Sequence, residues 1–214
     1  MIDPLNIERI NYLLIMVSVI AGAVVLEQIN AWVLLLKSLL AGKARWSWRH
    51  AAWNFIILYT FLFYWWAFWE HIENIGSNFF NFFIVLMNPT IYYVLIKTLN
   101  PSQKEIELLD GPNQTKRLDL GDFFEKVQIQ FYLFSALLSF FSYLTITQVY
   151  DPDFATTEEQ AVRFISLGSF LLASFVIWLC KQSEQRHLVK YIDLALLFIL
   201  LSLSNRALFL RGSI

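Results

Sequence analysis

The sequence predicts an all-α integral membrane protein, a bundle of six transmembrane helices, and three observations support this fold class. First, 57% of the 214 residues are hydrophobic and only 15% are charged, which is more apolar surface than one soluble core can bury. Second, the apolar residues fall into six runs, each near the roughly 20 residues that a helix needs to cross a bilayer. Third, the connections between these runs alternate between basic and acidic, as is typical of a multi-pass protein.

The expected spans are helices, because backbone that faces hydrocarbon must satisfy its own hydrogen bonds. They cover residues 10–36, 53–69, 78–97, 123–147, 161–180 and 188–210. We expect the first run to stay in the protein as a span, since Asp3 and Glu8 replace the basic start of a signal peptide and the run is too long for one. The spans form a single transmembrane domain, 1–214. The connection 100–122 is expected to be a cytoplasmic loop with one short interfacial helix around 103–109.

Charge in the connections predicts the orientation of the chain. Lysine and arginine concentrate in the first, third and fifth connections, as Lys37, Lys43, Arg45, Arg49, Lys97, Lys104, Lys116, Arg117, Lys181, Arg186 and Lys190. The second and fourth connections are mainly acidic, with Glu70, Glu73, Asp151, Asp153, Glu158 and Glu159. By the positive-inside rule the odd connections face the cytoplasm, so both termini face outside.

Glu27 is the main indication of function, because it lies inside the first span, flanked by Gln28 and Asn30. A charged group near the centre of a span costs about 3 kcal/mol on insertion scales and marks a functional site by default. Asn30 follows three residues later on the same helical face. The sequence therefore predicts that Glu27 binds and releases a proton or small cation.

Asn88 and Pro89 form a second feature, near the middle of the third span. Proline removes a backbone donor and frees the carbonyl oxygen of Val85, four residues earlier. In hydrocarbon that oxygen needs another donor, and protonated Glu27 is one candidate. We therefore expect Glu27, Asn30, Asn88 and Pro89 to line a proton or ion pathway.

The alternative for Glu27 is a structural role. As a neutral, hydrogen-bonded acid it would tie the first span to the third or to the fourth, where Gln128 and Gln130 are expected at a similar depth. The sequence leaves both alternatives open.

Tryptophans border the second span at both ends, as Trp46, Trp48 and Trp53 and as Trp65, Trp66 and Trp69. Such rings favour the two headgroup levels, so they can simply fix the depth of the helix. The functional alternative is an outer vestibule made of Trp65, Trp69, Glu70 and His71, in which ring faces and a carboxylate hold a cation. Trp65 and Trp69 are four residues apart and share a helical face.

Small residues in the fourth and fifth spans permit close helix packing. They recur at helical spacing as Ser135, Ser139, Ser142, Gly168, Ser169, Ala173 and Ser174. Such faces join helices within one subunit or between subunits, and a water-lined serine stripe is the alternative. Because six helices leave little room for a central pathway, we expect a homo-oligomer.

Other function classes are disfavoured by the sequence. A net charge of −1 without a basic domain argues against a nucleic-acid partner. Cys180 is the only cysteine, which excludes an intramolecular disulfide and multi-cysteine metal sites. No set of His, Asp, Cys or Glu gathers at one interface with metal or nucleophile spacing, so we expect no metal, no cofactor and no catalytic residue, and an enzyme acting on lipid is disfavoured. His50 and His187 share the expected cytoplasmic side, which is compatible with a haem pair, although solvated interfacial histidine is commoner.

The run from Trp53-Asn54 through Trp65-Trp66-Ala67-Phe68-Trp69, followed by Asn88-Pro89, resembles small bacterial multi-spanning membrane proteins of unassigned function. The resemblance covers spans two to four. It implies a bacterial cytoplasmic (inner) membrane and carries no activity, ligand or site residue.

The functional expectation is a small channel or transporter for a proton or small cation, with the lipid bilayer and further copies of the chain as its partners. A non-conducting scaffold or sensor subunit that binds a protein or lipid partner is the alternative, in which the polar groups only fix helix contacts.

Cysteine labelling tests the expected orientation. In a chain lacking Cys180, we expect an impermeant maleimide to label Asn74→Cys in intact cells and to spare Asn113→Cys until the membrane is permeabilised, because only the acidic connection faces outside. Labelling of Asn113→Cys with protection of Asn74→Cys would overturn the orientation.

Overall fold

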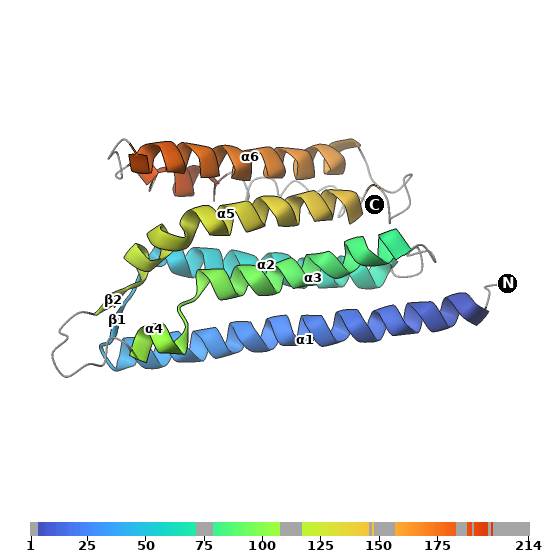
Figure 1. Ribbon diagram of the computed structural model, residues 1–214, viewed down its shortest axis with the longest axis horizontal. Helices are drawn as coiled ribbons and strands as arrows, with labels where there is room; N and C mark the ends of the chain where they lie inside the picture. Colours follow the sequence, from blue (N-terminus) through green and yellow to red (C-terminus); the bar gives the residue numbers. More distant parts are fainter. Residues whose placement is uncertain are drawn as a thin grey trace. The chain divides into compact units, whose positions relative to one another are not determined.

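Helices make up most of the computed structural model (Figure 1). The structure describes residues 4–71, 79–107, 117–145, 147, 157–182, 188–189, 191–196 and 198. The helices are α1 (Pro4–Leu40), α2 (Trp48–His71), α3 (Phe79–Leu99), α4 (Gln103–Glu107), α5 (Leu120–Leu144) and α6 (Thr157–Gln182). The prediction of an all-α fold is therefore confirmed.

Four of the described helices are long and apolar enough to cross a membrane, at Asn11–Leu40, Phe79–Ile106, Leu120–Leu144 and Phe164–Gln182. This supports a membrane-embedded protein. They correspond to the first, third, fourth and fifth expected spans. Helix α2 covers the second expected span, 53–69, but is not one of these four. The sixth expected span, 188–210, lies mostly outside the described residues.

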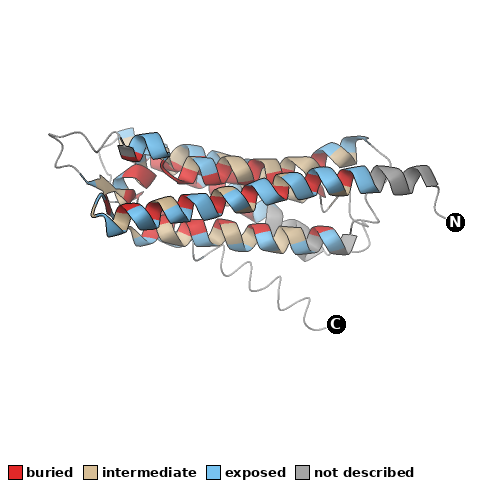
Figure 2. Ribbon diagram, turned by 90° about the horizontal axis from the view of Figure 1, so that it is seen from below, coloured by how far each residue is buried: buried red, intermediate tan, exposed pale blue. Residues whose placement is uncertain are grey.

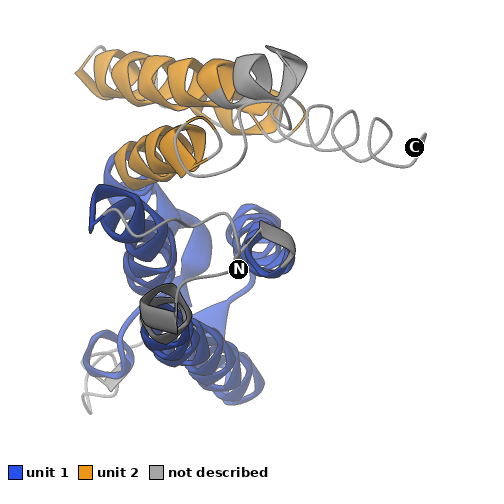
Figure 3. Cartoon of the chain, turned by 90° about the vertical axis from the view of Figure 1, so that its right-hand side faces the viewer, with its two compact units in different colours: residues 1–131 blue, residues 132–214 orange. Residues whose placement is uncertain are grey.

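The chain divides into two compact units, Met1–Phe131 and Tyr132–Ile214, with the division inside α5 (Figure 3). In the first unit α3 packs against both α1 and α2. In the second unit the ring of Tyr132 in α5 packs against the ring of Phe170 in α6, with their centroids 6.0 Å apart.

Helix α1 buries one narrow stripe and exposes apolar residues elsewhere (Figure 2). The buried residues recur every three or four positions and are Leu13, Val17, Ala21, Val24, Gln28, Ala31, Leu35 and Ser38. The opposite faces carry Tyr12, Val19 and Leu36, which are 68%, 67% and 58% exposed. An apolar helix with only one stripe in protein contact has its remaining surface suited to lipid.

A tight turn ends α1 and leads into a short pair of strands. Gly42 adopts a positive φ of 69°, and the amides of Gly42 and Lys43 donate to the carbonyls of Leu39 and Ser38 at 3.0 and 2.8 Å. This pattern caps the last carbonyls of the helix. Strand β1 (Ala44–Arg45) then pairs in parallel with β2 (Leu118–Asp119), a pairing that the sequence had not predicted.

Side-chain caps begin the helices α4 and α5. Ser102 and Glu105 form a reciprocal capping box at α4, with the Ser102 amide 2.7 Å from Glu105 Oε2 and the Glu105 amide 3.3 Å from Ser102 Oγ. The short helix expected around 103–109 is thus present over Gln103–Glu107. Asp119 Oδ1 accepts the Gly121 amide at 2.8 Å and so caps α5.

The small residues of α5 and α6 are mostly buried. Ser135, Ser139, Ala173 and Ser174 are each at most 9% exposed, whereas Gly168 is exposed. Most of this expected packing face therefore serves contacts within one chain. In the same unit the Tyr132 hydroxyl donates to Asp193, and both residues are fully buried.

Candidate functional site

Five polar residues from three helices of the first unit form the candidate site, which we call the polar corner. They are Glu27 and Gln28 of α1, Asn54 of α2, Lys97 of α3 and Asn100 directly after α3. The second turn of α2 and the last turn of α3 bring these side chains against α1, toward the end of the unit that carries β1, β2 and α4 (Figure 1).

Glu27 and Lys97 are an ion pair between two candidate spans. Glu27 Oε1 lies 2.7 Å from Lys97 Nζ. The Lys97 side chain is 51% exposed and that of Glu27 is 24% exposed, so the pair lies at the boundary of the protein interior. The Lys97 ammonium also lies 5.7 Å from the centroid of the Tyr93 ring, one helical turn earlier.

Asn54 connects the residues next to this ion pair. Its Oδ1 accepts hydrogen bonds from Gln28 Nε2 at 2.9 Å and from Asn100 Nδ2 at 3.0 Å. The three side chains are at most 7% exposed. Because Gln28 adjoins Glu27 and Asn100 follows Lys97 by one turn, the shared acceptor sets α1 and α3 at the register in which the ion pair forms.

His50 supports Asn54 from one turn earlier in α2. His50 Nε2 donates to the Leu99 carbonyl at 3.0 Å, and Asn54 Nδ2 donates to the His50 carbonyl at 3.1 Å. Burial lowers the pKa of His50 to about 4, against the smaller opposing effect of its bond to Leu99. The neutral ring therefore holds the end of α3 against the first turns of α2. His50 itself precedes the expected span 53–69 in the sequence.

Two buried amide oxygens of the polar corner, Gln28 Oε1 and Asn100 Oδ1, have no hydrogen-bond partner among the described residues. A buried acceptor without a donor costs about 1 to 3 kcal/mol, so such atoms call for a donor or a cation. Both amide nitrogens bond to the same oxygen of Asn54, which keeps the two oxygens in one neighbourhood. Among its described residues the polar corner thus holds one carboxylate and two buried amide oxygens, the kinds of oxygen atom that a proton or a hard small cation binds.

Two of the other three expected pathway residues, Asn88 and Pro89, lie elsewhere. Asn30 is exposed, on a different face of α1 from buried Gln28. Asn88 and Pro89 are buried in α3, but Asn88 precedes Lys97 by nine residues, which is about 13.5 Å along the helix and about half a turn around it. Asn88 and Pro89 therefore lie away from Lys97 along α3, whereas Asn30 stays one helical turn from Glu27 on α1.

The carbonyl freed by Pro89 has a donor other than Glu27. Tyr64 Oη, from α2, donates to the Val85 oxygen at 3.0 Å. This bond satisfies the acceptor that proline leaves in the middle of the helix.

The aromatic end of α2 is only partly described. Trp65 and Trp69 meet edge to face with centroids 5.9 Å apart, and Trp69 is 50% exposed. The side chains of Glu70 and His71, which were expected to complete an outer vestibule, lie outside the described residues.

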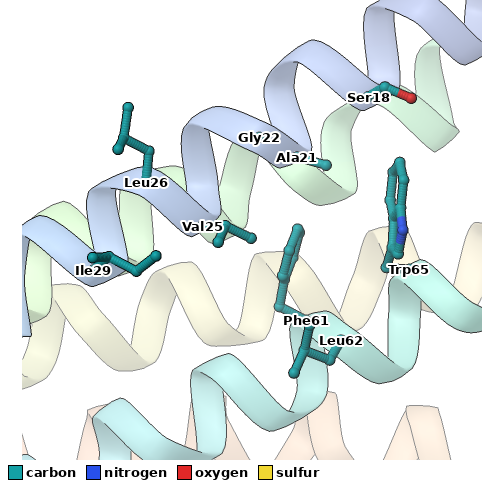
Figure 4. A pocket seen from close by; sticks show the side chains of 9 residues that line it. All are labelled: Ser18, Ala21, Gly22, Val25, Leu26, Ile29, Phe61, Leu62 and Trp65. Atoms are coloured by element: carbon teal, nitrogen blue, oxygen red, sulfur yellow. The ribbon is translucent and has the colours of Figure 1, made fainter.

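An apolar hollow of about 500 Å³ opens between α1 and α2 (Figure 4). Phe61, Leu62 and Trp65 line it from α2, and Gly22 and Val25 from α1, with Ser18 as its one hydroxyl. A lining of this kind suits hydrocarbon rather than an ion.

No group of three or more His, Cys, Asp or Glu that could hold a metal ion occurs in the described part of the chain. Comparison with known protein families, with curated proteins and with solved structures finds no match to this chain. The case for function therefore rests on the polar corner itself.

Sequence reasoning found Glu27 but not its partners. Lys97 had been counted as a charge of the third connection, and no role had been assigned to Asn54 or Asn100. The available signal was the helical spacing of Lys97 and Asn100, and of His50 and Asn54, which places each pair on one face.

Replacing Asn54 tests the polar corner. Asn54→Leu keeps the branching of the side chain at Cγ but removes the shared acceptor, so we expect the free energy of unfolding in detergent to fall by about 1 to 3 kcal/mol. Asn30→Leu is the matched control, because Asn30 is exposed, and it should leave the unfolding midpoint nearly unchanged. Equal midpoints for the two variants would contradict the importance of the Asn54 contacts.

Proposed function

We propose that this chain is a small channel or transporter that moves a proton or small cation across a bacterial cytoplasmic membrane. In this proposal the chain has six spans with both termini outside, assembles as a homo-oligomer, and handles the ion at the polar corner.

The 2.7 Å ion pair between Glu27 and Lys97 is the observation that carries the proposal. Ionisable residues within candidate spans are rare and costly, and this one is paired with a cation from another candidate span. Two buried oxygens that have no donor among the described residues belong to Gln28, next to Glu27, and to Asn100, three residues after Lys97. These features support an ion-exchange site, because buried acceptors near an ion pair call for a donor or a cation.

In the proposed mechanism the Lys97 ammonium stays paired with the Glu27 carboxylate until a proton or cation binds to the carboxylate in its place. Lys97 is half exposed, so its long side chain can swing to water when it is displaced. A pair with this exposure contributes about 0 to 1 kcal/mol, so the exchange costs little. Since Lys97 begins the basic third connection, the corner opens to the cytoplasmic side in the proposed topology.

A non-conducting scaffold or sensor is the second candidate, and the apolar hollow between α1 and α2 favours it. In that role the hollow takes an apolar group of a lipid or protein partner, and Glu27 and Lys97 only fasten α1 to α3. The absence of ion flux through the purified wild-type chain would favour this candidate.

Ion flux through reconstituted protein tests the proposed role of Glu27. Glu27→Gln keeps the shape and the hydrogen-bonding capacity of the side chain but removes its charge, so we expect flux to fall by about tenfold or more, corresponding to about 1.4 kcal/mol on the barrier. Folding and assembly should survive, because the amide can still bond to Lys97 or a neighbour.

Glu105→Gln is the matched control, since Glu105 is exposed and glutamine can also complete a capping box. It should conduct like the wild type. Wild-type flux in a well-folded Glu27→Gln protein would contradict the proposed role of this residue in transport.

A further inference from the structure

The short parallel strand pair brings together cations from two distant connections. Ala44 is in register with Leu118 and Arg45 with Asp119, and the Leu118 amide donates to the Lys43 carbonyl at 2.8 Å. Lys43 and Arg117 each precede the first paired residue of their strand, so they lie side by side at the start of the pair. Both residues are exposed.

Strand alternation places these cations on the outer face. Ala44 is 7% exposed and points into the protein, so Lys43 and Arg45 on either side of it point away. The Arg45 side chain is 79% exposed. The outer face of the strand pair thus presents Lys43, Arg45 and Arg117.

One carboxylate, that of Asp119, faces these three cations from the strand pair. Its Oδ1 caps α5 through the Gly121 amide, and its Oδ2 lies 3.8 Å from Arg45 Nη1. At that distance and exposure the pair is weak, so the described residues of the strand pair carry three cations and one carboxylate on this face.

The position of this face along the chain matches the headgroup level of a membrane. Lys43 follows the end of one candidate span, Leu40, by three residues, and Arg117 precedes the start of another, Leu120, by three. Trp46 and Trp48 follow β1 and are 63% and 50% exposed. Exposed indole rings favour the interface between headgroups and hydrocarbon.

We propose that the outer face of the β1–β2 pair, with Trp46 and Trp48 beside it, binds the phosphate headgroup of an anionic phospholipid. Charge complementarity selects an anionic over a zwitterionic headgroup, and the adjacent tryptophans select a lipid over a soluble phosphate. This site is separate from the polar corner and does not depend on transport.

Lipid binding to the purified full chain in mild detergent tests this assignment. Phosphatidylglycerol and phosphatidylcholine of the same acyl chains are titrated in parallel, and bound lipids are counted by native mass spectrometry. We expect tighter binding of phosphatidylglycerol. The double variant Lys43→Gln with Arg117→Gln should weaken it by about 25-fold, or about fivefold for each cation removed near the surface.

Two controls separate this site from general surface charge and from misfolding. Lys37→Gln with Lys104→Gln removes two exposed cations that are not on the strand pair and should leave the affinity nearly unchanged. Lys43→Arg with Arg117→Lys keeps both charges and should also bind like the wild type, while circular dichroism verifies that each variant is helical.

Three results would overturn the proposal. One is equal wild-type affinity for the two lipids, and another is equal loss in the strand-pair and control double variants. The third is displacement of bound phosphatidylglycerol by inorganic phosphate at a matched concentration, which would show a soluble-anion site.

Discussion

The side-chain oxygen of Asn54 is the contact on which the arrangement of the first unit depends. By accepting hydrogen bonds from Gln28 and Asn100, it joins α1, α2 and the end of α3 at one buried point. In a bilayer, apolar side chains alone do little to fix the register between packed helices, because lipid tails are as apolar as leucine. A shared polar acceptor supplies that register, and it brings Glu27 opposite Lys97 as a consequence.

Further contacts stabilise the end of the first unit that carries the polar corner. The β1–β2 pair ties the connection after α1 to the one before α5, and Arg49 of α2 holds Glu125 of α5 at 2.9 Å. The Arg49 guanidinium also lies 5.5 Å from the centroid of the Phe124 ring. Specific polar contacts therefore concentrate toward one end of the unit, while its middle carries apolar packing such as the Phe61–Tyr92 ring contact.

The sequence was sufficient for features that depend on local patterns. The helical class, the helices over the first five expected spans, the short helix after α3 and the polar character of the Glu27 region follow from hydrophobic runs, capping residues and helical spacing. Features that depend on tertiary placement were not accessible. Nothing local shows that Lys97 turns toward α1, that Tyr64 reaches the Val85 carbonyl, or that two-residue strands 74 positions apart pair. The neighbourhood of Pro89 could be recognised as needing a donor, but the identity of that donor depends on how α2 packs on α3.

Replacing Lys97 tests most directly the claim that this residue and the transported ion compete for Glu27. In reconstituted vesicles, Lys97→Gln removes the competing ammonium, so the concentration of proton or cation that gives half-maximal flux should fall, by about fivefold for a competition of about 1 kcal/mol. Lys104→Gln, an exposed lysine of α4, should leave that concentration unchanged. An unchanged half-saturating concentration in a folded, conducting Lys97→Gln protein would contradict the exchange of Lys97 for the ion.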